Sequence, residues 1–370
     1  MSVTWSQALA WRMRQQLLNP VGTGSVTDVV RRLGAVVAQP ATAAELAVCV
    51  RRAGGRSGEV AAALAEGRII KTYAFRGASH LLTPGDGSAY LALRAASRMW
   101  ELPSWQRFYG LTPADWQPLR ETVAAALADG PLTREELAAA VTARPAFRHL
   151  GAAFADGADT FFKPLAWQGV MSFGPSRGGR VTFQRLDHNP AWAGLPSVDE
   201  AGVRAIEAYF RSYGPATVDH LRYWLGEGLG VRRRQLQTWV ADLGDRLAAV
   251  DIDGETAYVL GEDLPGLTAA QVGPATTVVR LLPGYDQWVL GPGTADARVV
   301  PPARRQLVSR GEQLVILDGV VSGTWSFADD RVTVAWFGEA GQPPEAALAT
   351  EVARLGTILD RPLRSAVRIV

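Results

Sequence analysis

The chain has 370 residues, a formal net charge of +2, 48% hydrophobic residues and a mean hydropathy of +0.02. This composition excludes a disordered or membrane-embedded protein, and the length allows two to four domains. The N-terminal segment is amphipathic and lacks the apolar core and cleavage site of a signal peptide, so we expect a cytoplasmic protein. The single cysteine, Cys49, lies in an apolar run and is predicted to be a core side chain in a reducing compartment.

Three stretches of the chain share one plan. Each places a turn, a threonine that can cap a helix and apolar residues at helical spacing before further helix and two strand-like segments. The second pair of strands surrounds PSRGG and the third surrounds DIDGE, both good hairpin turns. A helix-turn-helix followed by a hairpin is the winged-helix plan. The stretches are GSVTDVVRRL (24–33), GPLTREELAAAV (130–141) and GPATVDHLRYWL (214–225).

The pattern changes near residue 270 to short segments with period-two alternation, including TTVVRLLPGYDQWVL, QLVILDGVVSGTWSF and RVTVAWFG. We expect a small, mostly antiparallel C-terminal β-barrel or sheet with a closing helix near PEAALATEVARLGTIL, after a Gly- and Pro-rich linker at 263–274. The predicted fold class is α+β. The predicted domains are three tandem winged helices and the barrel, at 1–84, 85–196, 197–264 and 265–370.

A glutamine stands at the joint between two helical patterns, in GAVVAQPATAAELAV. Because proline disfavours helical backbone in the residue before it, Gln39 is predicted to be extended, with its amide free. Thr42 and Glu45 have capping-box spacing, which predicts that the next helix starts at Thr42. A loop glutamine that bonds to nearby backbone is the alternative reading of Gln39.

Several kinds of chemistry are excluded by the motifs that are missing. The four histidines, His80, His149, His188 and His220, have no metal-pair spacing, and no cysteine set exists. There is no nucleophile elbow, no Walker loop and no dinucleotide-binding glycine motif after a strand. We therefore expect no metal and no nucleotide cofactor.

Winged helices favour nucleic acid as the partner. Candidate phosphate contacts are Arg177 and Arg180 on the second hairpin and the run Arg232, Arg233 and Arg234, with a solvated surface as the alternative. The sequence has two lysines, Lys71 and Lys163, and the rest of its Lys+Arg total is arginine. Arginine suits bidentate contacts with phosphate and guanine, although genomic base composition can produce the same bias.

Five stretches stand in order between about residues 34 and 325, namely YAFRGASHLLTP, LAWQGVMSFGPSRGGRVTF, YGPATVDHLRYWLG, LLPGYDQWVLG and DGVVSGTW. They resemble the AlkZ/YcaQ-like family of bacterial winged-helix DNA glycosylases. The resemblance implies tandem winged helices plus a β-barrel in a C-shaped DNA-binding scaffold. It also implies excision of N7-alkylated guanine, including bulky or crosslinked adducts, from double-stranded DNA without a cofactor.

The family's catalytic motif, Gln-x-Gln or Gln-x-Asp, falls on Val37 to Gln39. Of its two polar positions, the first is Val37 here and only the last, Gln39, is polar. A companion motif, His or Thr followed by an apolar residue and Arg, falls on Ala74 to Arg76 and keeps only the arginine. Two polar side chains replaced by apolar ones predict a pocket remodelled for a larger or more apolar adduct. Lost activity is the alternative.

The resemblance makes Gln39 the residue that positions the attacking water. Alkylation at N7 already makes guanine a cationic leaving group, so a neutral amide that orients water can suffice. Arg76 would bind a phosphate or brace the pocket, and Tyr285 with Asp286 would shape the DNA groove. The rival reading is a non-enzymatic winged-helix regulator or lesion sensor. Three unequal units in one chain do not fit a two-fold operator, which favours a monomeric enzyme.

Overall fold

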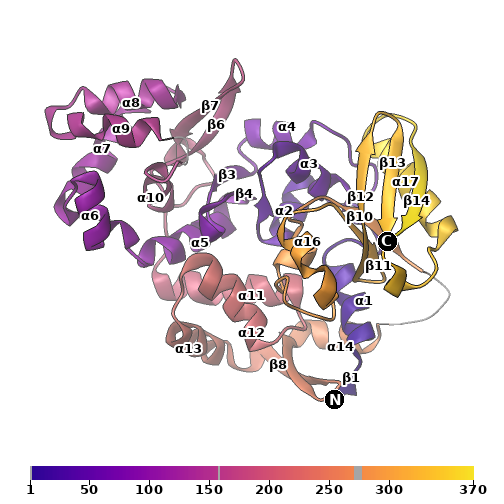
Figure 1. Cartoon of the computed structure of the whole chain (residues 1–370). Helices are drawn as coiled ribbons and strands as arrows, with labels where there is room; N and C mark the ends of the chain where they lie inside the picture. The colour runs from indigo at the N-terminus through magenta and orange to yellow at the C-terminus, as the bar shows by residue number, and fades with distance from the viewer. Residues whose placement is uncertain (1, 157–158, 271–276) are drawn as a thin grey trace.

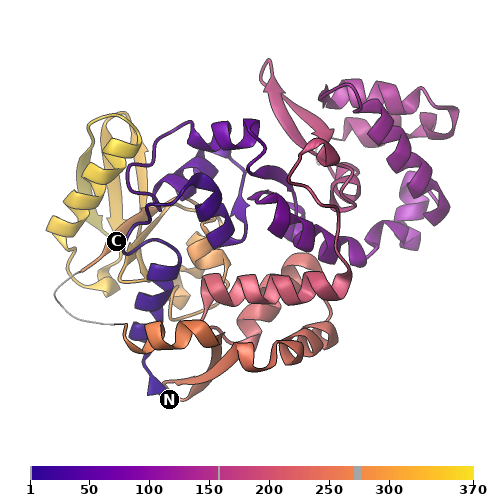
Figure 2. The same ribbon diagram turned by 180° about the vertical axis from the view of Figure 1, so that it is seen from behind.

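The computed structural model describes residues 2–156, 159–270 and 277–370. Over these ranges the chain has a mixed α+β fold, whose strands form three three-stranded sheets and one five-stranded sheet. We call the segments around the small sheets the first (26–82), second (116–185) and third (198–260) units. Figures 1 and 2 show the first unit between the second unit and the yellow C-terminal sheet, with the third unit below it.

The first unit has the strand order β2–β4–β3. Its leading helix is capped by Ser25, whose hydroxyl accepts a hydrogen bond from the amide of Asp28. The predicted threonine cap of this stretch is wrong, because the extended Ser25 takes the capping position two residues before Thr27. The elements are α2 (Val26–Leu33), β2 (Val36–Val37), α3 (Ala41–Cys49), α4 (Glu59–Ala65), β3 (Ile70–Tyr73) and β4 (Ser79–Leu82).

The second unit repeats this topology with the order β5–β7–β6. The predicted cap is confirmed here, since Thr133 and Glu136 form a reciprocal capping box. The predicted hairpin turns at Gly178 and Gly179, which both have positive φ, and its tip extends beyond the neighbouring helices in Figures 1 and 2. The elements are α7 (Trp116–Ala126), β5 (Leu132–Thr133), α8 (Arg134–Thr142), α9 (Gly151–Ala155), α10 (Phe162–Trp167), β6 (Met171–Arg177) and β7 (Arg180–Arg185).

The third unit borrows a strand from the chain's start. Residues Ser2 and Val3 form β1, which pairs in parallel with β8 and was not predicted, because two residues carry no alternation. Thr217 caps the short helix α12, as expected. The elements are α1 (Trp5–Gln15), α11 (Val198–Tyr213), α12 (Val218–Leu221), a π-helical turn (Arg222–Glu227), α13 (Arg233–Leu243), β8 (Leu247–Ile252) and β9 (Glu255–Leu260).

The C-terminal region is an open sheet, so the predicted barrel is wrong and the alternative of a sheet is what the structure has. The strand order is β10–β11–β12–β13–β14, and no pairing among the described residues joins β10 to β14. The sheet stays open because α17 carries the chain over to β14, which pairs in parallel with β13 and ends the sheet. The elements are β10 (Val279–Leu282), β11 (Leu314–Leu317), β12 (Val320–Ala328), β13 (Arg331–Trp336), α17 (Glu345–Ile358) and β14 (Arg364–Ile369).

Two other expectations for this region are corrected. The segment GYDQWVL is not a strand, because Asp286 accepts a hydrogen bond from the amide of Trp288 and caps the helix α15 (Gln287–Leu290). The predicted linker contains α14 (Leu264–Thr268), and its residues 271–274 lie outside the described residues. The remaining helices are α5 (Pro84–Ala96), α6 (Pro103–Tyr109) and α16 (Arg305–Ser309).

Shared cores hold these parts together. Leu9 and Met13 of α1 and Leu46 of α3 are buried with the C-terminal sheet. A second, larger core runs from Ala35 through the aromatic interiors of the second and third units. The first unit is therefore packed against all the other parts, which fixes the position of its sheet.

Candidate active site

Gln39 lies at one end of the first sheet. Strand β2 pairs with β4 so that Val37 faces His80, and the amide of Ala38 donates to the carbonyl of Ser79 (2.8 Å). The next residue, Gln39, is exposed, and its side-chain amide makes no hydrogen bond with any residue that the structure describes. The alternative of a loop glutamine tied to nearby backbone is thus not what this structure has. The amide is available to a ligand or water.

The helix after Gln39 starts earlier than predicted. Helix α3 begins at Ala41, with Pro40 as its N-cap and no side-chain cap. Glu45 does not close a capping box, because its carboxylate accepts hydrogen bonds from the amides of Gly58 (2.8 Å) and Val60 (3.3 Å) at the start of α4. Gln39 is therefore separated from a rigid helix by one residue.

The companion motif forms the turn between β3 and β4, at this same end of the sheet. The amide of Ala74 donates to the carbonyl of Ala78 (3.0 Å), and Arg76 adopts a positive φ of 52° between them. Because β4 is the middle strand, this turn and Gln39 flank the same strand end. Ala74 is fully buried, so the expectation that it lines a pocket is wrong for this structure.

Arg76 points from this turn toward the third unit. Its guanidinium lies 4.2 Å from the centroid of the Tyr223 ring, 3.4 Å from the Tyr223 carbonyl and 3.8 Å from the Glu227 carboxylate. Beside it, Phe75 is buried 4.2 Å from the ring of Trp224. The π-helical turn of the third unit thereby holds the Arg76 guanidinium without burying it.

The histidine beneath this end is neutral. His80 is buried, and its Nδ1–H donates to the carbonyl of Ala78 (3.0 Å). Burial lowers the pKa of His80 to about 4, since the charged imidazolium would lose its hydration there. The first motif position, Val37, is half-buried against this ring across the sheet.

Asp286 does not belong to a DNA groove. Its side chain is fully buried in an ion pair with Arg51, with Nη2 2.6 Å from Oδ1 and Nη1 2.9 Å from Oδ2. It therefore joins the C-terminal region to α3, and the prediction that its side chain shapes the DNA groove is wrong for this structure. Tyr285 next to it is 40% exposed, and its hydroxyl donates to the carbonyl of Arg310 (3.1 Å).

The predicted phosphate contacts are all at the surface. Arg177 and Arg180 stand at the tip of the second hairpin, where Arg177 pairs with Glu136 at the start of α8. Arg232 to Arg234 are exposed before and in the first turn of α13. Two of them, Arg232 and Arg234, border a depression of about 530 Å³. The two arginine groups lie on different units, and their contact with DNA stays a prediction.

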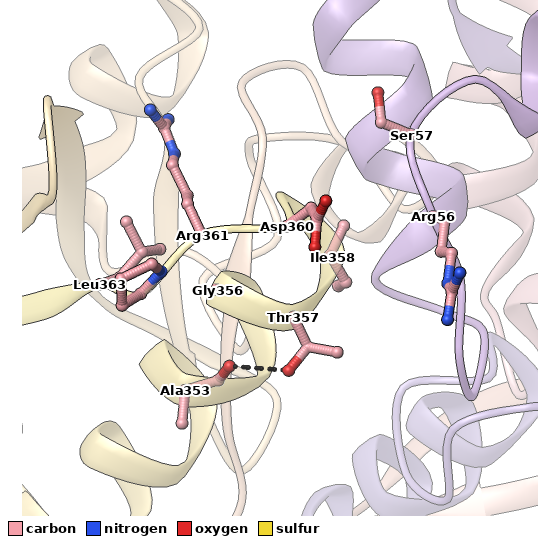
Figure 3. A pocket seen from close by; sticks show the side chains of 10 residues that line it. Arg56, Ser57, Ala353, Gly356, Thr357, Ile358, Asp360, Arg361 and Leu363 are labelled. Carbon is pink, nitrogen blue, oxygen red and sulfur yellow. Dashed lines mark hydrogen bonds between the residues drawn. The ribbon is translucent and has the colours of Figure 1, made fainter.

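Another depression lies away from this sheet end. It has a volume of about 900 Å³ and separates the loop at Arg56 and Ser57 from the end of α17 (Figure 3). Thr357 in its wall donates its hydroxyl to the carbonyl of Ala353 (3.2 Å). None of the predicted site residues, all of which the structure describes, lines it.

No group of His, Cys, Asp and Glu side chains in the described ranges could hold a metal ion. Cys49 is buried as predicted, and burial raises the pKa of its thiol to about 12. Across the residues described, no helix is both long and apolar enough to span a bilayer.

Comparison with known proteins defines the class of protein. The family model of AlkZ-like DNA glycosylases matches residues 30–358. The chain is 38% identical, over 98% of its length and 100% of the relative's, to an interstrand DNA cross-link repair glycosylase of Streptomyces sahachiroi. The solved structure of the Streptomyces sahachiroi DNA glycosylase AlkZ matches with a TM-score of 0.92 and 37% identity, covering 100% of both chains.

These matches identify a DNA glycosylase and favour the enzyme over the non-enzymatic regulator. The chain belongs to the AlkZ-like DNA glycosylase family, as its motifs predicted. Sequence reasoning missed Tyr223 and Glu227, which hold Arg76. No local pattern marks them, because they are about 150 residues away from it along the chain.

Proposed function

We propose that this enzyme hydrolyses the N-glycosidic bond of N7-alkylguanine in double-stranded DNA, including bulky and crosslinked adducts. The observation that carries the proposal is the exposed amide of Gln39, which no described residue hydrogen-bonds, beside the turn that presents Arg76. The relative's description as a cross-link repair glycosylase supports the same substrate class.

Gln39 would orient the attacking water. As the cationic guanine departs, the sugar develops oxocarbenium character and needs a water near its anomeric carbon. The carbonyl of a neutral amide accepts a hydrogen bond from that water and holds it in line. Because the leaving group is already charged, the site needs no strong general acid, and the neutral His80 does not supply one.

The three units would bind DNA as winged helices. Support comes from the strand orders β2–β4–β3 and β5–β7–β6, each with a closing hairpin, and from the single Ala216–Tyr258 bridge at the matching place in the third unit. With three such units in one chain, the protein would act as a monomer on a site without two-fold symmetry. A bulky adduct need not be flipped into a pocket for attack at its sugar.

The test is incubation of the enzyme with duplexes that carry either N7-methylguanine or a bulky N7 adduct, followed by alkaline cleavage at abasic sites. We expect abasic product, and the same yield with and without EDTA. Absence of abasic product from every N7 adduct would contradict the proposal. Inhibition by EDTA would point to a metal that the described residues do not accommodate.

A further inference from the structure

Lys163 reaches from the second unit to the turn that carries Arg76. It lies in α10, which packs against β3. A Cβ placed on Gly77 would lie 3.4 Å from the Cδ and 3.7 Å from the Nζ of Lys163. The ammonium is also 5.9 Å from the centroid of the Tyr73 ring. The same turn thus approaches Lys163 at Gly77 and Tyr223 through Arg76.

This ammonium has no counter-ion within the described ranges of the chain. Lys163 is half-buried and forms no ion pair or hydrogen bond there. The nearby Asp159 accepts a hydrogen bond from the hydroxyl of Tyr73 (2.6 Å) and pairs with Arg134. A partly desolvated cation without a partner costs free energy, which a bound anion would offset.

We infer that Lys163 binds a phosphodiester oxygen of the DNA strand that carries the target nucleotide. The inference rests on the proposed function, which brings DNA to this end of the sheet. An ammonium is a compact point charge with three donors, suited to a phosphate oxygen. Gly77 has no side chain between the ammonium and the turn, so the sugar-phosphate backbone of that DNA strand can approach the turn closely.

Lys163 acts on binding and not on chemistry. The transition state of N7-alkylguanine loss gathers positive charge on the sugar, which a second cation does not stabilise. Removing the positive charge that contacts one phosphate instead lowers the affinity for DNA and the salt dependence of that affinity. The effect is the same for damaged and undamaged duplexes. This split separates a phosphate contact from a general effect on the active site.

The experiment compares Lys163→Met, Lys163→Arg and Lys71→Met. Lys71 is the only other lysine, and its Nζ lies 4.9 Å from the centroid of the Phe173 ring, so its removal is a matched control for lost charge. Affinity for undamaged and adduct-bearing duplexes is measured by fluorescence anisotropy over a range of salt concentrations. Single-turnover excision is measured with saturating enzyme, and thermal unfolding checks the fold.

We expect Lys163→Met to weaken binding several-fold and to reduce the salt slope by about one unit. Lys163→Arg should keep both, Lys71→Met should change neither, and the saturated excision rate should stay within about twofold for all three. An unchanged salt slope, or a lower saturated rate with intact binding, would overturn the inference. Because affinity is read on undamaged DNA as well, this result is independent of whether Gln39 is catalytic.

Discussion

Val37 lies directly opposite His80 in the antiparallel pairing of β2 with β4. Side chains that face each other across such a pair project from the same face of the sheet, so the valine borders the buried imidazole. The first position of the family's catalytic motif is therefore an aliphatic group beside a neutral ring, two residues before the exposed Gln39. This end of the sheet is drier than one with two glutamines.

The Val37 position should set adduct preference. An apolar side chain favours adducts with apolar bulk, so the wild-type enzyme should excise bulky N7 adducts faster than N7-methylguanine, by about tenfold. Val37→Gln should reduce this ratio, whereas Val37→Ile should preserve it. Single-turnover rates on both substrates give the measurement. Equal wild-type rates would leave the valine without a role in selectivity.

His80 should make stability depend on pH. The pKa of His80 is about 4 in the folded protein against 6.5 for a free histidine, so the unfolded chain binds a proton more readily between these values. The stability that neutral His80 contributes is therefore complete above pH 6.5 and is lost as the pH falls toward 4. The loss is about 3 kcal/mol. Urea unfolding across this range should give a flatter profile for His80→Asn.

His149→Asn is the control for that series, because His149 is exposed. Its profile should follow the wild-type profile. If His80→Asn and the wild type lost stability in parallel between pH 6.5 and 4, the titrating group would have to lie elsewhere.

The hairpin arginines should contribute unequally to DNA binding. Both side chains are exposed, but Arg177 is paired with Glu136, which offsets part of its charge, whereas Arg180 forms no ion pair with a described residue. Replacing both arginines by Ala should weaken binding to every duplex and lower the salt slope by about one unit for each lost phosphate contact. Glu136→Gln keeps the capping-box geometry and should strengthen binding by freeing Arg177.

Salt titrations of DNA affinity measure both effects. Unchanged salt slopes in the double-alanine variant would show that these arginines are solvated surface residues without a phosphate contact. Weaker binding by Glu136→Gln would show instead that the ion pair orients Arg177 for DNA.

Asp286 should matter for folding and not for DNA contact. Asp286→Asn leaves the Arg51 guanidinium buried without its counter-charge, which costs about 3–5 kcal/mol. The expected result is a large drop in the midpoint temperature of unfolding. At temperatures well below that midpoint, where the variant is folded, its DNA affinity should be normal. Tyr285→Phe, at the exposed neighbouring position, should leave stability nearly unchanged. A loss of affinity without a loss of stability in Asp286→Asn would contradict this assignment.

Features that depend on neighbouring residues were predictable. The turns PSRGG and DIDGE fixed the hairpins β6–β7 and β8–β9 through local backbone preferences. The caps at Thr133 and Thr217 follow from one side chain and an amide three residues on. Gln39 was selected from the sequence because proline constrains the residue before it and because the family motif ends there, and its catalytic role stays a prediction.

Features that depend on distant residues were not predictable. The prediction of a barrel was wrong because closure requires β10 to pair with β14. Alternation within each strand carries no information about that pairing. No residue next to Asp286 in the sequence indicates its buried ion pair, because its partner Arg51 is 235 positions away. The same holds for the Arg76–Tyr223 stack, which two units build together.

The most direct test of the central claim is single-turnover excision of an N7-alkylguanine adduct by Gln39→Ala, with enzyme in excess. Since the Gln39 amide makes no hydrogen bond with any other described residue, folding and DNA affinity should be nearly intact in this variant. The rate should fall by about 10- to 1000-fold, which is about 1.4 to 4 kcal/mol in the barrier, while Gln39→Asp should retain activity. Excision by Gln39→Ala at the wild-type rate would contradict the claim that this amide positions the water.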